Sequence, residues 1–160
     1  MVNSKPIVIV DMDGTLADVA HRLHYIRGRG KPNWPRFFDE QCHDLPKENI
    51  VKRVCELAKD HEIVIVTGRP DKYLTETRDW LTKYKIPYSR IFMRPAGDNR
   101  PDYIVKKQIL GTIGAERVVL VLDDRPRVCE MYRQSGLKVF EVPSDEWNQE
   151  INEIYRKKSF

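Results

Sequence analysis

Two carboxylates directly follow a short apolar run near the start of the chain. The run is residues 7–10, and Asp11, Asp13 and Gly14 come after it. Because alternate residues of an extended backbone point to the same side, Asp11 and Asp13 are expected to face one point. Gly14 allows a sharp turn, and backbone amides around such a turn can bind an anion. This stretch therefore predicts a metal and phosphate site.

Two later apolar runs also lead into polar residues. Residues 63–66 are followed by Thr67, and residues 118–122 are followed by Asp123 and Asp124. Because the carboxyl ends of parallel strands lie at the same edge of a sheet, these side chains are expected to converge with the first pair of carboxylates. The three strand ends together are therefore expected to form one site.

These residue types suit the transfer of a phosphoryl group. Such a reaction needs a positioned nucleophile and neutralisation of the charge on the phosphoryl oxygens. Oxygen ligands from Asp11, Asp13 and Asp123, without a histidine or cysteine cluster, indicate Mg²⁺. One oxygen of Asp11 can attack phosphorus and form an aspartyl-phosphate. Asp13 can protonate the leaving alcohol and later deprotonate the attacking water.

Three further side chains have expected roles at this site. The hydroxyl and backbone amide of Thr67 can bind a phosphoryl oxygen, and Lys106 can neutralise charge opposite the metal. Asp102 precedes Lys106 by four residues on a predicted helix, so the two share a face and Asp102 could hold Lys106 in position. The neighbouring Lys107 is the alternative cation.

The elements that must position these residues alternate between strand and helix. Strands are predicted at 7–10, 63–66, 90–93, 118–122 and 139–142, and helices at 47–59, 71–84, from Pro101 to Gly111 or Gly114, and up to Ser135. This alternation predicts an α/β fold with an open, doubly wound parallel sheet covered by helices on both faces. The tail from Ser144, with Ile151, Ile154 and Tyr155 in period, predicts an amphipathic terminal helix.

Residues 18–46 interrupt this alternation. They show no sustained period, and their length is below the ~50 residues that a domain usually needs, so they predict a loop with one or two short helices. Trp34, Phe37 and Phe38 follow the possible helix cap Asn33 and are expected to pack on the core.

The same segment mixes basic and aromatic side chains, which suits contact with nucleic-acid phosphates and stacking on bases. The alternative is a solvated basic loop whose aromatic residues pack inward. The residues concerned are Arg22, Arg27, Arg29, Lys31 and Arg36, with His24, Tyr25 and Trp34.

Composition limits the classes of protein to consider. With 160 residues, 41% hydrophobic and 32% charged, the chain fits one globular domain. The net charge of +4 permits a polyanionic partner without requiring one. The scattered cysteines predict a reducing compartment and no structural zinc site. Without a signal peptide or a run of membrane-spanning length, we expect a cytoplasmic protein with no membrane association. The cysteines are Cys42, Cys55 and Cys129.

Together the motifs resemble those of the haloacid-dehalogenase (HAD) phosphohydrolases. Residues 11–15, Thr67, Lys106 and the pair Asp123 and Asp124 are similar to that family's four motifs and occur in the same order. The resemblance implies a HAD-like Rossmannoid sheet in a single domain over residues 1–160. It also implies that Asp124 is a metal ligand and that residues 18–46 are a small insertion instead of a cap domain.

A narrower resemblance is to the 3′-phosphatase domain of bacteriophage polynucleotide kinase. It is carried by Thr67-Gly68-Arg69 and by residues 97–100, 102–106 and 123–131. It implies removal of terminal 3′-phosphates from DNA or RNA in end repair, with a separate polynucleotide kinase or ligase as a possible partner. No Gly-rich loop ending in Gly-Lys-Ser/Thr is present, so kinase activity is not expected. The implied substrate-site residues are Arg22, Gly68, Arg69, Asp102 and Arg125.

Two other functions are compatible with the sequence. One is a nucleotidase that acts on free mononucleotides, with residues 18–46 closing over the base. The other, of a different class, is a non-catalytic nucleic-acid-binding module. Arg69 and Arg125 could also be surface ion-pair residues rather than phosphate ligands. We expect the choice of substrate to depend on residues 18–46, because this segment should overhang the crevice.

Overall fold

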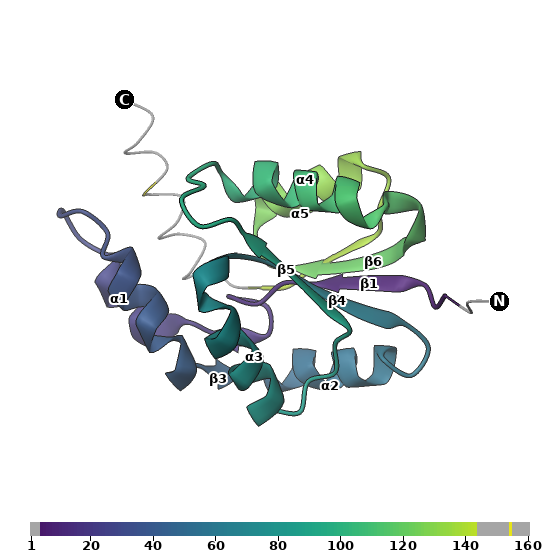
Figure 1. Ribbon diagram of the computed structural model, residues 1–160, viewed down its shortest axis with the longest axis horizontal. Coiled ribbons are helices and arrows are strands. Elements are labelled where there is room, and N and C mark those ends of the chain that lie inside the picture. The colour runs from purple at the N-terminus through teal and green to yellow at the C-terminus, as the bar shows by residue number, and fades with distance from the viewer. Residues whose placement is uncertain (1–3, 144–153, 155–160) are drawn as a thin grey trace.

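The fold is built on a five-stranded parallel sheet with the strand order β5-β4-β1-β6-β7 (Figure 1). The computed structural model describes residues 4–143 and residue 154. The strands are β1 (Ile7–Val10), β4 (Glu62–Pro70), β5 (Arg90–Arg94), β6 (Val118–Asp123) and β7 (Val139–Glu141). The predicted α/β class is confirmed, and β1, which carries the first carboxylate motif at its end, is the central strand.

Helices cover both faces of the sheet, as the alternation predicts. In Figure 1, α2 (Glu48–Leu57) and α3 (Leu74–Lys83) lie below it, and α4 (Asp102–Ile113) and α5 (Pro126–Gln134) lie above it. Side chains of β1 alternate between the two layers: Val8 belongs to the core with α2 and α3, and Ile9 to the core with α4 and α5. Burial on both faces explains why these strands are apolar throughout.

Residues 18–46 form short helices over one end of the sheet. The segment is closed at its base by β2 (Ala17–Asp18), which pairs antiparallel with β3 (Leu45–Pro46). It contains two 3₁₀ turns, η1 (Ala20–Tyr25) and η2 (Glu40–His43), and the helix α1 (Trp34–Asp39). The Asn33 side chain accepts a hydrogen bond from the Arg36 amide at 3.2 Å, so the expected cap is present.

Some boundaries differ from those expected. Strand β4 continues to Pro70, past the predicted 63–66, because Pro70 still pairs with Arg94 of β5 after a register shift. The helix predicted over 71–84 begins as a 3₁₀ turn, η3 (Asp71–Tyr73), and a further 3₁₀ turn, η4 (Ala115–Arg117), precedes β6.

The terminal helix predicted from Ser144 lies outside the described residues, apart from Ile154, which is helical and buried. Within residues 4–143 and at 154, no helix is long and apolar enough to cross a membrane.

Candidate active site

The first carboxylate motif lies at the carboxyl end of the central strand. The backbone amide of Asp11 donates a hydrogen bond to the Leu122 carbonyl of β6 at 3.0 Å, so Asp11 still belongs to the sheet edge. The chain then turns tightly, because the amides of Thr15 and Leu16 both donate to the Met12 carbonyl. A positive φ of 83° at Gly14 permits this turn.

Three buried carboxylates meet at this point. Oxygens of Asp11, Asp123 and Asp124 lie within 4.8 Å of one another, and each residue is at most 5% exposed. Lys106 Nζ lies 3.0 Å from Asp11 Oδ1 and 2.7 Å from Asp123 Oδ2. The Thr15 hydroxyl lies 3.3 Å from both Asp11 Oδ2 and Asp124 Oδ1. Three carboxylates beside one ammonium group leave two negative charges, which fits a divalent cation.

The electrostatics of this cluster also fit a cation. Burial and the charge of Asp123 raise the pKa of Asp11 to about 6, against the opposing effect of Lys106. Burial and the charges of Asp11 and Asp123 raise the pKa of Asp124 well above its ordinary value. For Lys106, burial acts to lower the pKa, but the charges of Asp11 and Asp123 outweigh it and raise the pKa well above the usual range. A hard cation bound by oxygen would relieve this repulsion.

Asp13 has different surroundings from Asp11. Its Oδ1 accepts hydrogen bonds from Arg22 Nη2 at 2.8 Å and from Arg69 Nε and Nη2 at 3.0 and 2.6 Å. Among the described residues, the carboxylate cluster that could hold a metal consists of Asp11, Asp123 and Asp124. Asp11 and Asp13 nevertheless line the same cavity, as their spacing predicts, and the charge of Asp13 contributes to the raised pKa of Asp11.

The arginine pair fixes the charge of Asp13. Burial acts to raise the pKa of Asp13, but the charges and hydrogen bonds of Arg69 and Arg22 outweigh it and hold this pKa far below its usual range. Asp13 is therefore ionised at neutral pH in this arrangement. It can accept a proton here, whereas donating one requires its arginine contacts to loosen first.

The buried carboxylate of Asp44 completes an ionic network behind Asp13. Arg22 donates to Asp44 through Nε at 2.8 Å and through Nη2 at 2.6 Å, and His21 Nε2 lies 2.7 Å from Asp44 Oδ1. Arg69 Nη1 donates to the Gln41 side chain at 2.6 Å. Both arginines are fully buried. Sequence reasoning missed Asp44 and Gln41, because single polar residues in an irregular segment carry no motif.

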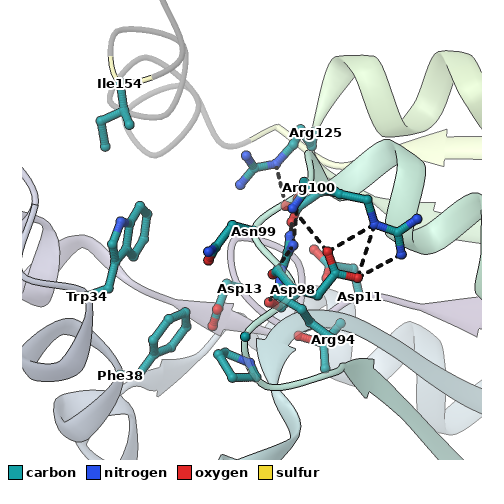
Figure 2. Close-up of a pocket in the computed structure, with 15 residues that line it drawn as sticks. Asp11, Asp13, Trp34, Phe38, Arg94, Asp98, Asn99, Arg100, Arg125 and Ile154 are labelled. Carbon is teal, nitrogen blue, oxygen red and sulfur yellow. Dashed lines mark hydrogen bonds and ion pairs between the residues drawn. The ribbon is translucent and has the colours of Figure 1, made fainter. Parts of the chain in front are cut away.

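A cavity of about 210 Å³ opens in front of these groups (Figure 2). Six of the residues expected at the site line this cavity: Asp11, Asp13, Thr67, Gly68, Asp102 and Arg125. The other expected residues lie buried behind the lining: Arg22, Arg69, Lys106, Asp123 and Asp124. The cavity is thus connected to the carboxylate cluster through Asp11.

Asp102 lies at the cavity, and its negative charge helps to raise the pKa of Lys106, as expected for two charged groups on one helix face. Its carboxylate pairs with Arg94 Nη2 and, at 3.3 Å, with Arg125 Nε. Arg94 also donates to the Gly68 carbonyl at 2.9 Å, a role that the sequence did not indicate. Asp102 stands in the first turn of α4 and lies against Gly68, Arg94 and Arg125, whereas the Lys106 side chain reaches Asp11 after β1 and Asp123 of β6. The alternative cation, Lys107, is exposed.

Thr67 is also buried, at 1% exposure, at the edge of the cavity. Its hydroxyl accepts a hydrogen bond from the Arg69 amide at 3.2 Å. The fold thus brings Thr67 of β4 to the same cavity as Asp11, which follows β1. In the same way, Arg69 contacts Asp13 although 56 positions separate them in the sequence.

Comparison with known proteins identifies relatives of this arrangement. A family model described as the polynucleotide kinase PNKP phosphatase domain matches residues 5–147. A protein of Autographa californica nuclear polyhedrosis virus, named as a bifunctional polynucleotide kinase/RNA ligase, is 31% identical over 86% of this chain and 19% of the viral protein. The chain thus spans about a fifth of this relative's length.

Solved structures show the same fold. A chain in the Pnkp1/Rnl/Hen1 RNA repair complex has a TM-score of 0.72 and 29% identity, over 88% of this chain and 43% of that chain. A HAD family enzyme from Bacteroides thetaiotaomicron, solved with magnesium and inorganic phosphate, has a TM-score of 0.56 and 8% identity, over 89% of this chain and 96% of its own. At that identity the second likeness concerns the fold alone.

Proposed function

The chain belongs to the family of polynucleotide kinase PNKP phosphatase domains, within the HAD phosphohydrolases, and from that premise we propose that it removes terminal 3′-phosphates from DNA or RNA. The observation that carries this proposal is the placement of Asp11, which lines the cavity and also belongs to the buried carboxylate cluster beside Lys106. The relatives named for polynucleotide kinase, RNA ligase and RNA repair support a nucleic-acid end as the substrate.

Asp11 is the proposed nucleophile. Its carboxylate attacks phosphorus, the bond between phosphorus and the 3′-oxygen breaks, and that oxygen takes up a proton from Asp13, whose contacts with Arg22 and Arg69 loosen so that it can carry one. Water then attacks the phosphorus of the aspartyl-phosphate, which releases phosphate and restores the carboxylate. Lys106, at 3.0 Å from Asp11 Oδ1, keeps this carboxylate oriented, and the Thr67 hydroxyl and amide are proposed to bind a phosphoryl oxygen.

Mg²⁺ is the proposed cofactor, and Asp11, Asp123 and Asp124 are the residues that would hold it. The ion would neutralise charge on the phosphoryl oxygens when bound. Asp13, which the sequence also indicated as a ligand, lies outside this cluster of the described residues, and its Oδ1 is held by Arg22 and Arg69. Its ionised carboxylate is suited to take a proton from the attacking water in the second step.

Kinase and ligase activities are proposed to act on the same nucleic-acid ends. The viral relative is named for both activities, and this chain matches about a fifth of it. Removing a 3′-phosphate leaves a 3′-hydroxyl, which a ligase can join to a 5′-phosphate. The phosphatase would thus prepare one of the two ends that a ligation needs.

The test is a comparison of substrates. Phosphate release with Mg²⁺ is measured on a 3′-phosphorylated oligonucleotide, on the same oligonucleotide phosphorylated at its 5′ end, and on mononucleotides. We expect the 3′-phosphorylated oligonucleotide to have the highest kcat/KM. A preference for mononucleotides would replace this proposal with the nucleotidase, and binding without release from any substrate would favour the non-catalytic module.

The matched control for this comparison changes one exposed carboxylate. Asp39→Asn removes one charge from residues 18–46 on the exposed side of α1. It should leave the rates of phosphate release from all three substrates unchanged. Asp11→Asn, prepared in the same way, should abolish them and so excludes a contaminating phosphatase.

A further inference from the structure

Two aromatic side chains of α1 form one wall of the cavity. Trp34 and Phe38 are four residues apart, so they lie on the same face of the helix. Their ring centroids are 5.9 Å apart and their planes differ by 25°. Both rings are partly exposed, and both line the cavity together with Asp11. We call this pair the aromatic wall.

The aromatic wall is braced from behind. The buried ring of Phe37 contacts Trp34 at 5.5 Å and Phe38 at 5.3 Å between centroids, both edge to face. Phe38 also lies 5.3 Å from the ring of Tyr73, at the start of the α3 segment. These contacts fix the orientation of the two rings, so a planar group in the cavity would meet a surface that is already in place.

The opposite side of the cavity is polar, and its carboxylates are already paired. Figure 2 shows Trp34 and Phe38 on one side, with Arg94, Asp98 and Arg100 on the other. Arg100 Nη2 lies 2.7 Å from Asp98 Oδ2, and Arg94 pairs with Asp102. A ligand between the two sides therefore faces aromatic carbon on one side and hydrogen-bonding groups on the other.

This combination of surfaces fits a nucleobase. A base has an apolar face that stacks on aromatic rings and a polar edge that forms hydrogen bonds. A phosphorylated sugar without a base has no planar face to place against two aromatic rings. We propose that the aromatic wall is the site for the base of the terminal nucleotide whose 3′-phosphate reaches Asp11. The inference rests on the proposed function and names the part of the substrate that residues 18–46 bind.

The basic residues of the same segment do not lie at this site. Arg22 is fully buried behind Asp13, and the Arg36 guanidinium lies 5.4 Å from the ring of Tyr25. Neither lines the cavity, nor do Arg29 and Lys31. The part of recognition that residues 18–46 supply therefore relies on stacking, which tolerates every base because each has a π-face. We expect little discrimination among the four terminal bases.

The test compares two substrates that differ in the terminal base. One is a 3′-phosphorylated oligonucleotide, and the other is the same oligonucleotide with an abasic site at its 3′-phosphorylated end. For the unchanged protein we expect a KM for the abasic substrate roughly five- to one-hundred-fold higher. Trp34→Ala should raise the KM of the base-bearing substrate by a similar factor and leave that of the abasic substrate unchanged. Trp34→Phe, which keeps a ring, should retain most of the affinity.

Tyr25→Ala is the matched control. Tyr25 packs on the same buried cluster as Trp34 and Phe38 but does not line the cavity, so its loss should affect both substrates equally. Equal KM values for the two substrates in the unchanged protein, with phosphate released from both, would overturn the base site and leave the proposed function standing. A Trp34→Ala effect of the same size on both substrates would also overturn it. Release from neither substrate would contradict the proposed function itself.

Discussion

Two aspartates only two positions apart have opposite charge environments. Asp11 lies against Asp123 and Asp124, and burial with these carboxylates raises its pKa to about 6. Asp13 lies against two arginines that hold its pKa far below the usual range. Groups whose surroundings push their pKa values apart are suited to different tasks in one reaction. Asp11 is accordingly suited to bind a cation and attack phosphorus, and Asp13 to handle a proton.

We expect full activity to require glycine at position 68, because a side chain there would collide with Asp102. A Cβ added at Gly68 would lie 2.6 Å from Asp102 Oδ1, and that carboxylate is held by Arg94 and Arg125. Gly68→Ala should therefore displace Asp102 from the cavity wall and lower kcat/KM by about tenfold to a hundredfold. Steady-state kinetics on a 3′-phosphorylated oligonucleotide measure the effect.

Gly111→Ala is the control for this substitution. A Cβ at Gly111 meets no atom within 4 Å, and an alanine in the helix α4 should stabilise it slightly. Full activity in both variants would show that the position of Asp102 does not matter for the reaction.

At the scale of elements, residues 18–46 are joined to the sheet by buried charges. Asp44, just before β3, binds Arg22 of η1, and Arg22 binds Asp13 beyond the end of β1. Arg69 of β4 joins the same carboxylate of Asp13. The segment that carries the aromatic wall is thereby held in a fixed position beside Asp13 and the proposed nucleophile Asp11.

Asp44→Asn should lower the stability of the protein and also its rate of phosphate release. The substitution leaves Arg22 and Arg69, both fully buried, with one carboxylate fewer between them. Breaking a buried ion pair from one side typically costs about 3–5 kcal/mol of unfolding free energy. Urea unfolding measures this loss. Asp79→Asn, an exposed change on α3, should cost less than about 0.5 kcal/mol. Equal midpoints for the two variants would contradict the proposed importance of the network.

Much of this arrangement could be predicted from local signals. Apolar runs that end in acidic residues predicted the parallel sheet, the edge of the sheet at which the site lies, and the cluster around Asp11 and Asp123. The Asn33 cap and the helical spacing after it gave α1. These features follow from patterns within a few residues of sequence.

The rest depends on contacts between distant segments. Asp13 lies against Arg22 and Arg69, which come from two other segments, and the spacing of Asp11 and Asp13 does not reveal these partners. The ion-pair partners of Asp102 are Arg94 at the end of β5 and Arg125 after β6, which belong to other elements than its own helix. Asp44 is a single polar residue in an irregular segment, and the direction in which α1 presents Trp34 and Phe38 to the cavity follows from tertiary packing.

Across the whole molecule, negative charge is in excess where the central strand ends, at Asp11, Asp123 and Asp124. Because the pKa of Asp11 is raised from 3.8 to about 6, the stability that this group contributes is fully present below its ordinary pKa and is lost as the pH rises through about 6. A divalent cation binds the ionised carboxylate, so its affinity should increase over the same range.

Mg²⁺ should therefore stabilise the fold more at about pH 8 than at about pH 5. At a concentration one hundred times its Kd, a ligand adds about 2.7 kcal/mol to the stability of the folded state. Thermal unfolding with and without Mg²⁺ at the two pH values measures this difference. Asp123→Asn should remove most of the Mg²⁺ effect at the higher pH. An equal Mg²⁺ effect at both pH values would contradict the assignment of the cation to Asp11.

The most direct test of the account is a search for the phosphorylated form of Asp11 during turnover. The protein is mixed with Mg²⁺ and a 3′-phosphorylated oligonucleotide, quenched in acid at short times, digested and analysed by mass spectrometry. We expect a phosphoryl group on the peptide that contains Asp11, appearing before free phosphate and absent with the 5′-phosphorylated oligonucleotide. Undiminished phosphate release by Asp11→Asn, with no phosphorylated peptide at any time in the unchanged protein, would contradict it.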